Sequence, residues 1–299
     1  MKIKLFLDFS CCLVLQIQLI LNYLQKNKVL KLFHLLSLDV VVGTVISSKM
    51  FWKLPFGNSQ VNMPSLIILA AATWAIYILD RILDIRISTE NLTIRHQFHH
   101  TNRKTLVLLA IILIIICFIE VFFLPKRIIL NGIILGGLII IYFLILNLKL
   151  YNIHYQWIKE PVTSFFYTSA VAGIPIFRNP QIGNVDYGLV IIFGIIVLIN
   201  LVLFSYFEYL QKPKSINLCS KLDISGSKKL IFLLFIIGFS ASFSLLFFAN
   251  HYQQKVIFIK ILMQLTLLFI FIKHKSFLEN EKYRWLADGV FLLPLLLEI

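Results

Sequence analysis

The chain has 299 residues, of which 59% are hydrophobic and 14% are charged. A soluble domain averages about 45–50% apolar and about 25% charged residues, so this chain has too little polar surface to cover a water-soluble globule. The formal net charge of +14 would suggest a nucleic-acid partner in a soluble protein. In a membrane protein, Lys and Arg gather in cytoplasmic loops instead. We therefore expect membrane lipids, and no nucleic acid, as partners.

Apolar segments long enough to cross a bilayer recur along the chain. A helix needs about 17–25 apolar residues to span the hydrocarbon core. Polar, turn-rich breaks separate the segments, which favours helical spans over the short alternating strands of a barrel. We predict an all-α polytopic membrane protein with about nine transmembrane helices, at residues 33–52, 64–85, 105–124, 128–148, 161–177, 187–209, 230–249, 256–272 and 285–297.

The start of the chain allows several interpretations. Residues 1–24 are apolar but include Asp8 and three amide side chains. A tenth span, an interfacial helix and a signal peptide fit this pattern, and the signal peptide fits least because no small-residue cleavage site follows. We expect an N-terminal extension at residues 1–30, as an interfacial or peripheral extra helix, and one membrane-embedded domain at residues 31–299.

Lys and Arg are distributed unequally between the two sides of the predicted bundle. Most of them fall in the loops at residues 86–104, 149–159, 212–229 and 273–284, which share one side in the nine-span arrangement. Because positively charged loops stay in the cytoplasm, we expect these loops to be cytoplasmic.

Two aspartates mark the cytoplasmic end of the second predicted span. Asp80 and Asp84 are four residues apart, so both carboxylates project from one helix face. Acidic side chains close to hydrocarbon usually face a cavity or a partner. Two carboxylates one turn apart suit Mg²⁺, which keeps several waters and bridges to phosphate groups. The alternative is a pair of structural salt bridges to Arg81 and Arg86 at the membrane interface.

Basic residues follow these aspartates and recur in the next cytoplasmic loop. Arg95, Arg103 and Lys159 can add positive charge around a diphosphate, and arginine does so with bidentate hydrogen bonds. The alternative is a set of basic loops that fix topology and contact anionic lipid headgroups.

The sixth predicted span carries a second polar stretch near its end. Asn200, Phe204, Glu208 and Lys212 recur every four residues and share one helix face, with Glu208 the single acid among them. We expect Glu208 to face the same cavity as Asp80 and Asp84. Lys212 is expected to pair with Glu208 or to contact a diphosphate oxygen as a point charge.

Several blocks of the sequence together resemble the UbiA superfamily of intramembrane prenyltransferases. Its first motif reads Asn-x-x-x-Asp-x-x-x-Asp before a basic loop, and here Ile76 stands in place of Asn ahead of Asp80 and Asp84. The stretch around Glu208 falls where the second acidic motif of that family is expected. Further blocks look like a divergent bacterial branch, namely those around Asp39, Arg95-His-Gln-Phe-His, Lys159-Glu-Pro and Leu-Ala-Asp288-Gly-Val-Phe.

The resemblance implies a UbiA-like helical bundle in a bacterial-type inner membrane. It also implies transfer of an isoprenyl chain from its diphosphate to a lipophilic acceptor, as part of lipid metabolism. In such a site Asp80 and Asp84 would hold Mg²⁺, one ion rather than two, because the second motif keeps only Glu208. Arg95, Arg103, Lys159 and Lys212 would bind the diphosphate.

Two other functions remain open at this point. One is a catalytically silent relative that binds a lipid diphosphate or acts as a membrane scaffold, which the reduced second motif favours. The other is a small-solute transporter, which is disfavoured because the acids and bases cluster at one membrane face and no pair of broken helices is evident.

Overall fold

The computed structural model describes residues 16–19, 21–87, 94–149, 157–213 and 217–298. Helix accounts for 87% of the structure, and the described residues form no strand. The helices in chain order are α2 (Lys28–Leu35), α3 (Leu38–Trp52), α4 (Met63–Ile87), α5 (Ile94–Thr101), α6 (Arg103–Val121), α7 (Lys126–Lys149), α8 (Lys159–Arg178), α9 (Asn184–Gln211), α10 (Leu218–Leu246), α11 (His251–Ile272), α12 (His274–Phe277), η2 (Glu279–Glu281), α13 (Lys282–Gly289) and η3 (Val290–Leu297).

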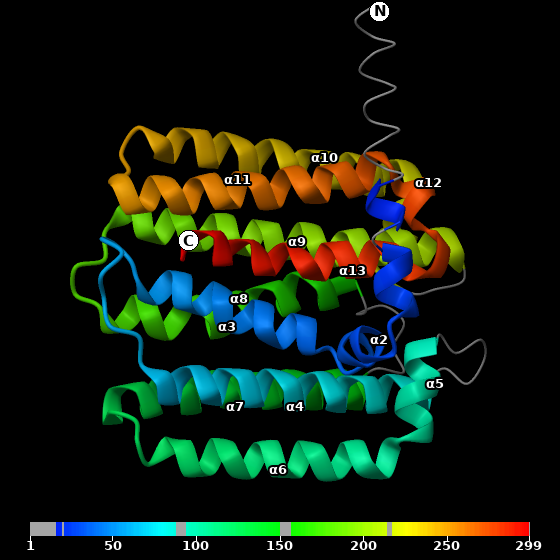
Figure 1. Ribbon diagram of the computed structural model, residues 1–299, viewed down its shortest axis with the longest axis horizontal. Helices are drawn as coiled ribbons and strands as arrows, with labels where there is room; N and C mark the ends of the chain where they lie inside the picture. The colour runs from blue at the N-terminus through cyan, green and yellow to red at the C-terminus, as the bar shows by residue number, and fades with distance from the viewer. Residues whose placement is uncertain (1–15, 20, 88–93, 150–156, 214–216, 299) are drawn as a thin grey trace, which may run out of the picture.

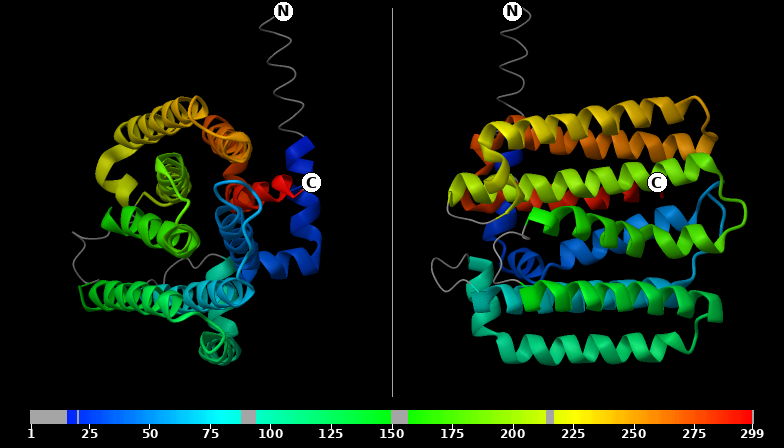
Figure 2. Two further views of the ribbon diagram at one scale, coloured as in Figure 1. Left: turned by 90° about the vertical axis from the view of Figure 1, so that its left-hand side faces the viewer. Right: turned by 180° about the vertical axis from the view of Figure 1, so that it is seen from behind.

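The long helices lie side by side with similar axes, and the chain crosses the bundle repeatedly (Figures 1 and 2). Helix α9 lies inside, in contact with α8, α10 and α11, while α4 packs against α3 and α6. The short helices α2, α5 and α12 gather at one end of the bundle (Figure 1). We call this the α5 end. The helix ends that flank the loops predicted to be cytoplasmic lie at this end. Which side of a membrane this end faces stays a prediction.

The multi-pass membrane prediction is confirmed in coarse form. Within the described residues, five helices are long and apolar enough to cross a membrane, or six if α2 and α3 count as one bent span. The count of nine stays a prediction. One reason for the difference is α3, which has only 15 residues because the chain bends by 70° before it. Another is the last predicted span, which divides into α13 and η3.

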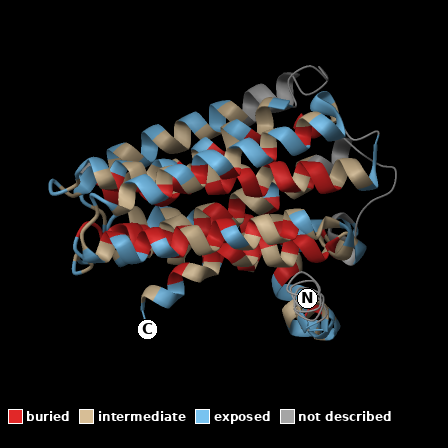
Figure 3. Ribbon diagram, turned by 90° about the horizontal axis from the view of Figure 1, so that it is seen from above, coloured by how far each residue is buried: buried red, intermediate tan, exposed pale blue. Residues whose placement is uncertain are grey.

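The outward faces of the outer helices are apolar. On α6, Ile115 is 51% exposed and Phe118 is 69% exposed, and on α10 Phe232 is 58% exposed. Buried residues concentrate between the helices, and exposed ones face outward (Figure 3). Such surfaces are unfavourable in water but match lipid chains, so the bilayer solvates the sides of the bundle.

Small residues allow some of these helices to approach closely. A Cβ atom added to Gly43 of α3 would lie 2.8 Å from Phe291 Cβ of η3, and one added to Gly188 of α9 would lie 2.7 Å from Leu245 Cδ1 of α10. Small residues at such contacts are typical of membrane helix packing, where dispersion contacts replace the hydrophobic driving force.

Asparagine side chains begin three of the helices. Asn27, Asn217 and Asn250 cap α2, α10 and α11, and each accepts a hydrogen bond from a backbone N–H of the first turn. These caps satisfy donors that a helix leaves without internal partners. After the Asn217 cap, α10 begins twelve residues before the predicted apolar span. The prediction began later because the first turns of this helix are polar.

The described part of the N-terminal extension is helical and packs on the bundle. Residues 16–19 and 21–26 are helical, Leu21 is buried, and the Gln18 side chain donates a hydrogen bond of 2.9 Å to the Ser276 carbonyl. This segment runs across the axes of the long helices at the α5 end (Figure 1). The crossing direction fits the interfacial interpretation, which stays a prediction.

Candidate functional site

The first aspartate motif lies at the α5 end of helix α4. The Asp80 side chain is 27% exposed, and its Oδ1 lies 3.7 Å from Nζ of Lys159, the first residue of α8. Asp84 follows one helical turn later, so its backbone continues the same face. The Asp84 side chain lies outside the described part of the structure. The expected carboxylate pair is therefore positioned by one helix, beside a base from another.

The residue after Lys159 fixes the start of α8. Glu160 is buried and accepts hydrogen bonds from the Ser205 hydroxyl of α9 and, at 3.3 Å, from the Leu218 backbone N–H of α10. Asn217 also donates a hydrogen bond of 3.1 Å to the Ser205 carbonyl. The Glu160 carboxyl group thus joins α8, α9 and α10. This junction holds the neighbouring Lys159 in place near Asp80.

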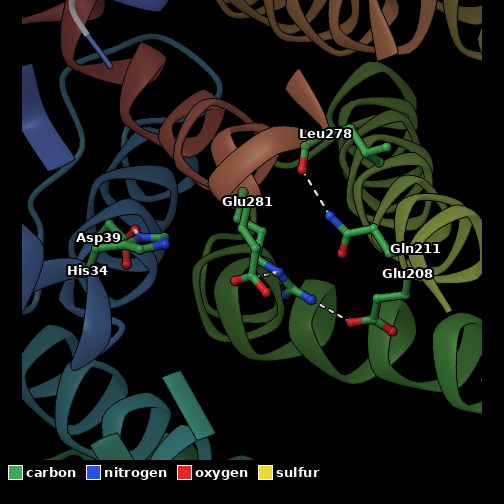
Figure 4. A network of polar contacts seen from close by, with 7 residues as sticks. His34, Asp39, Glu208, Gln211, Leu278 and Glu281 are labelled. Carbon is green, nitrogen blue, oxygen red and sulfur yellow. Dashed lines mark hydrogen bonds and ion pairs between the residues drawn. The ribbon is translucent and has the colours of Figure 1, made fainter. Parts of the chain in front are cut away.

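The second motif places Glu208 against the C-terminal part of the chain. Glu208 forms an ion pair with Arg284 of α13, whose Nε also lies 3.6 Å from Glu281. Figure 4 shows Glu208 and Glu281 around this contact, beside a hydrogen bond of 2.9 Å from the Gln211 side chain to the Leu278 carbonyl. The C-terminal segment is therefore fastened to the end of α9.

Arg284 is held by aromatic rings as well as by carboxylates. Its side chain is only 7% exposed, and its guanidinium lies 5.0 Å from the Phe204 ring centroid. The Tyr283 ring stacks on Phe207 at 4.1 Å. A planar guanidinium suits this combination of ring faces and carboxylates better than an ammonium would.

Electrostatics link the two motifs, although α4 and α9 are distant in sequence. Arg284, Arg81 and Lys159 all act on Glu208 as attractive charges, from α13, α4 and α8 respectively. Lys159 therefore interacts with both Asp80 and Glu208. We call Asp80, Arg81, Lys159, Glu208 and Arg284 the acid–base cluster.

The other predicted diphosphate ligands lie around this end of the bundle. Arg103 is exposed at the first position of α6, and Arg95 belongs to α5, its side chain outside the described part. Lys212 is exposed and follows the last residue of α9, with non-helical φ and ψ angles of −135° and 88°. Their roles as diphosphate ligands stay predictions.

Two functional candidates were missed by the sequence analysis. Arg284 was read only as one more base of a cytoplasmic loop, and its pairing joins residues 76 positions apart. His34 forms a hydrogen bond with Asp39 across the break between α2 and α3. Neither pairing follows a helical period. The aromatic neighbours of Arg284 and the spacing of five between His34 and Asp39 were the only signals present.

The described residues bear on the expected Mg²⁺ ion mainly through Asp80, which is partly exposed and paired with Lys159. Asp84 follows on the same helix, and Mg²⁺ takes carboxylate oxygens together with several waters. Glu208 is already engaged by Arg284, whose charge would repel a second cation. A single ion at Asp80 and Asp84 therefore stays a prediction, while Arg284 provides a fixed base beside Glu208 of α9.

A separate hollow of about 490 Å³ involves the other end of the bundle. It is lined by residues that include Lys53 of the α3–α4 connection, Asn250 of the α10–α11 connection and Lys255 of the first turns of α11. These connections lie away from the α5 end (Figure 1). The acid–base cluster and this hollow are therefore different places.

Comparison with protein-family models, with curated proteins and with solved structures gave no significant match.

Proposed function

We propose that this chain is a membrane prenyltransferase of UbiA-like type, which transfers an isoprenyl chain from its diphosphate to a lipophilic acceptor. The observation that carries the proposal is the position of Lys159. It forms an ion pair with Asp80 of the first motif, and its charge adds to the larger attraction that Arg284 and Arg81 exert on Glu208 of the second. Acids and bases from four helices are thereby gathered at one end of an apolar bundle, which is where a diphosphate head with a lipid tail would enter.

The diphosphate end of the substrate would bind within the acid–base cluster. Asp80 and Asp84 would hold Mg²⁺, which supplies charge neutralisation for the diphosphate leaving group. Lys159 would exchange its contact with Asp80 for a phosphate oxygen as the substrate binds. This exchange is cheap, because its side chain is 42% exposed and a partly exposed ion pair contributes only about 0–1 kcal/mol. Arg95, Arg103 and Lys212 would add positive charge at the rim.

The reaction would take place at the border between this polar end and the apolar interior. The allylic carbon–oxygen bond breaks, and pyrophosphate leaves with the bonding electrons. The acceptor forms the new bond to that carbon and loses a proton. Apolar helix faces would keep water away from the electron-poor carbon and prevent hydrolysis.

The silent relative is the second candidate, and one observation favours it. Asp80 and Glu208 each have a basic partner, Lys159 and Arg284. A cluster whose acids are neutralised by bases can bind a lipid diphosphate without a metal ion, or serve as a structural tie. This candidate predicts binding without turnover.

A purified-protein assay separates these candidates. The full chain in nanodiscs is supplied with isoprenoid diphosphates of several lengths and lipophilic aromatic acceptors, and pyrophosphate release is measured with Mg²⁺ and with a chelator. We expect Mg²⁺-dependent release that falls at least tenfold in Asp84→Asn. Binding of a non-hydrolysable isoprenoid diphosphate analogue is measured in parallel by calorimetry.

The control variant is Glu120→Gln, which changes an acid on α6 near the end distant from Arg103. It should keep wild-type release. Binding of the analogue without release, and unaffected by the chelator, would replace the enzyme by the silent relative. No binding at all would exclude both candidates.

A further inference from the structure

Three side chains from separate helices meet next to the N-terminal bend. His34 belongs to α2, Asp39 to α3 and Asp288 to α13, so residues far apart in the sequence come together. Each offers one ligand atom, and these three atoms all lie within 4.8 Å of one another. His34 Nδ1 is also hydrogen-bonded to Asp39 Oδ2. Figure 4 shows His34 and Asp39 side by side, apart from Glu208.

His34 and Asp288 are buried, and Asp39 is nearly so, with a side chain that is 13% exposed. Residue exposure is 6% for His34, 9% for Asp39 and 6% for Asp288. Two carboxylates this close repel each other, and burial weakens the screening by water. Such a pair needs positive charge between its oxygens, whether a proton, an imidazolium or a metal ion.

The surroundings fix the orientation of the nitrogen and oxygen atoms. The His34 ring stacks on Trp285 with a centroid distance of 4.2 Å. The second carboxylate oxygen of Asp39 accepts a hydrogen bond of 3.0 Å from the Val40 backbone N–H. Contacts of this kind around ligand side chains are typical of metal sites, because they hold each ligand in its binding orientation.

We infer that His34, Asp39 and Asp288 form a binding site for one divalent cation of the zinc class. Ligand atoms of a tetrahedral zinc ion, each at about 2.0–2.2 Å from it, lie about 3.3–3.6 Å from one another. For the three atoms to bind one ion, the 4.8 Å spread must therefore contract and the His34–Asp39 hydrogen bond must open. An imidazole nitrogen with two carboxylates suits Zn²⁺ or Mn²⁺, whereas Mg²⁺ prefers oxygen ligands alone. This site is distinct from the Asp80–Asp84 pair and does not rest on the proposed function.

A second observation at the same bend agrees with a bound ion. Ser37 lies in the turn between α2 and α3, is 1% exposed, and its hydroxyl has no hydrogen-bond partner among the described residues. An unsatisfied buried hydroxyl is unfavourable by about 1–3 kcal/mol. A three-ligand zinc site keeps one position for water, and Ser37, which precedes the ligand Asp39 by two residues, would gain a partner if that water lay within its reach.

The ion would connect both α2 and α13 to α3. Asp39 and Asp288 are about 250 positions apart in the sequence, so the site would close a loop of that length. Asp288 also interacts electrostatically with Arg284 and with Tyr77 of α4. Occupancy of the site therefore fixes α13, which supplies Arg284 to the acid–base cluster.

The test measures metal binding directly. The full chain in detergent is treated with a chelator and freed of it, and Zn²⁺, Co²⁺ and Mg²⁺ are then titrated by calorimetry, with Co²⁺ also followed by visible absorption. We expect one equivalent of Zn²⁺, a Co²⁺ spectrum of a nitrogen–oxygen site, and at least tenfold weaker Mg²⁺ binding at this position. Asp288→Asn and His34→Gln should each remove the Zn²⁺ equivalent.

Two control variants keep the test sharp. Asp186→Asn changes another buried aspartate, 1% exposed and bonded to Gln253, and Asp80→Asn changes the proposed Mg²⁺ pair; both should retain the Zn²⁺ equivalent. If Asp288→Asn fails to fold, the Co²⁺ spectrum of the wild-type chain still reports on the ligands. No Zn²⁺ or Co²⁺ binding by the wild type, or stoichiometric binding that survives both ligand variants, overturns the site and leaves a hydrogen-bonded cluster.

Discussion

The two polar clusters at the α5 end differ most in their access to water. In the acid–base cluster, the Asp80, Lys159 and Glu208 side chains are 27%, 42% and 45% exposed. In the His34–Asp39 pair, the exposed fractions are 8% and 13%. Partly exposed ion pairs can change partners at little cost, whereas buried ones cannot. The first cluster is therefore suited to a substrate that comes and goes, and the second to a permanent tie.

Arg284 combines a buried side chain with a partly exposed partner, and its substitution should give the largest loss of stability. Its own side chain is 7% exposed, while its partner Glu208 is 45% exposed. Arg284→Met leaves Glu208 and Glu281 without this cation and should lower the free energy of unfolding by about 2–4 kcal/mol, somewhat below the range for fully buried pairs. Thermal unfolding in detergent, followed by intrinsic fluorescence, measures the loss.

Two companion variants interpret that measurement. Glu208→Gln in the Arg284→Met background should recover part of the loss, because it removes the carboxylate that was left unpaired. Lys255→Met changes an exposed base of α11 and should have little effect. If Arg284→Met and Lys255→Met lowered the free energy of unfolding equally little, Arg284 would behave like a surface charge. The contrast drawn between buried and exposed charges would then be wrong.

Glu160 is expected to have the next largest effect. Glu160→Ala removes the acceptor of the Ser205 hydroxyl and of the Leu218 backbone N–H, and unsatisfied buried donors cost about 1–3 kcal/mol each. Glu160→Gln keeps an acceptor oxygen and should cost clearly less. Unfolding temperatures of the two variants are compared; equal losses would show that the negative charge, and not the acceptor, is what matters.

Substitution of Asp80 should change stability little and ligand binding strongly, in contrast to Arg284 and Glu160. Asp80→Asn weakens one ion pair between partly exposed side chains, so the free energy of unfolding should fall by no more than about 1 kcal/mol. Mg²⁺-dependent binding of an isoprenoid diphosphate analogue should fall at least tenfold. Binding comparable to that of the wild type would remove Asp80 from the ligand set. A large loss of stability would instead make it a structural residue.

The helical bundle could be predicted from hydropathy, because lipid-facing segments must satisfy their backbone hydrogen bonds internally. Each predicted span overlaps a helix of the structure, but the ends differ. Ser37 adopts a left-handed conformation with φ of 57°, and the predicted span at residues 33–52 breaks there. An apolar average over many residues does not register a single turn of this kind.

The site could be predicted only where its residues share one helix. Asp80 and Asp84 follow the helical period within α4, whereas Lys212, which has the same spacing from Glu208, lies just beyond the end of α9. The pairing of Glu208 with Arg284, and of Asp39 with His34, depends on which helix ends become neighbours after folding. Sequence periodicity contains no such information. In the acid–base cluster the sequence identified the acids and Lys159, but it did not identify Arg284 as the partner of Glu208.

The smallest expected effect comes from the far end of the chain, at the ion pair between Glu298 and Lys49. Glu298 accepts a hydrogen bond of 2.8 Å from the Lys49 ammonium, which lowers the pKa of Glu298, with a further contribution from Lys53. A lowered pKa means that the unfolded chain binds the proton more tightly. The stabilisation is therefore complete above the ordinary glutamate pKa of about 4.3 and is lost as the pH falls through the lowered pKa.

Glu298→Gln tests this pair against the buried clusters. At pH 7 the variant should lose about 0–1 kcal/mol, as exposed pairs do. This difference from the wild type should shrink as the pH falls through the lowered pKa of Glu298, because the carboxyl then becomes neutral in the folded state as well. Glu279→Gln, an exposed acid of η2, is the matched control and should follow the wild-type pH profile. Unfolding temperatures between pH 3 and pH 7 provide the measurement. A loss that stays constant as the pH is lowered would show that Glu298 acts through packing, and the contrast between exposed and buried pairs would then not extend to this end of the chain.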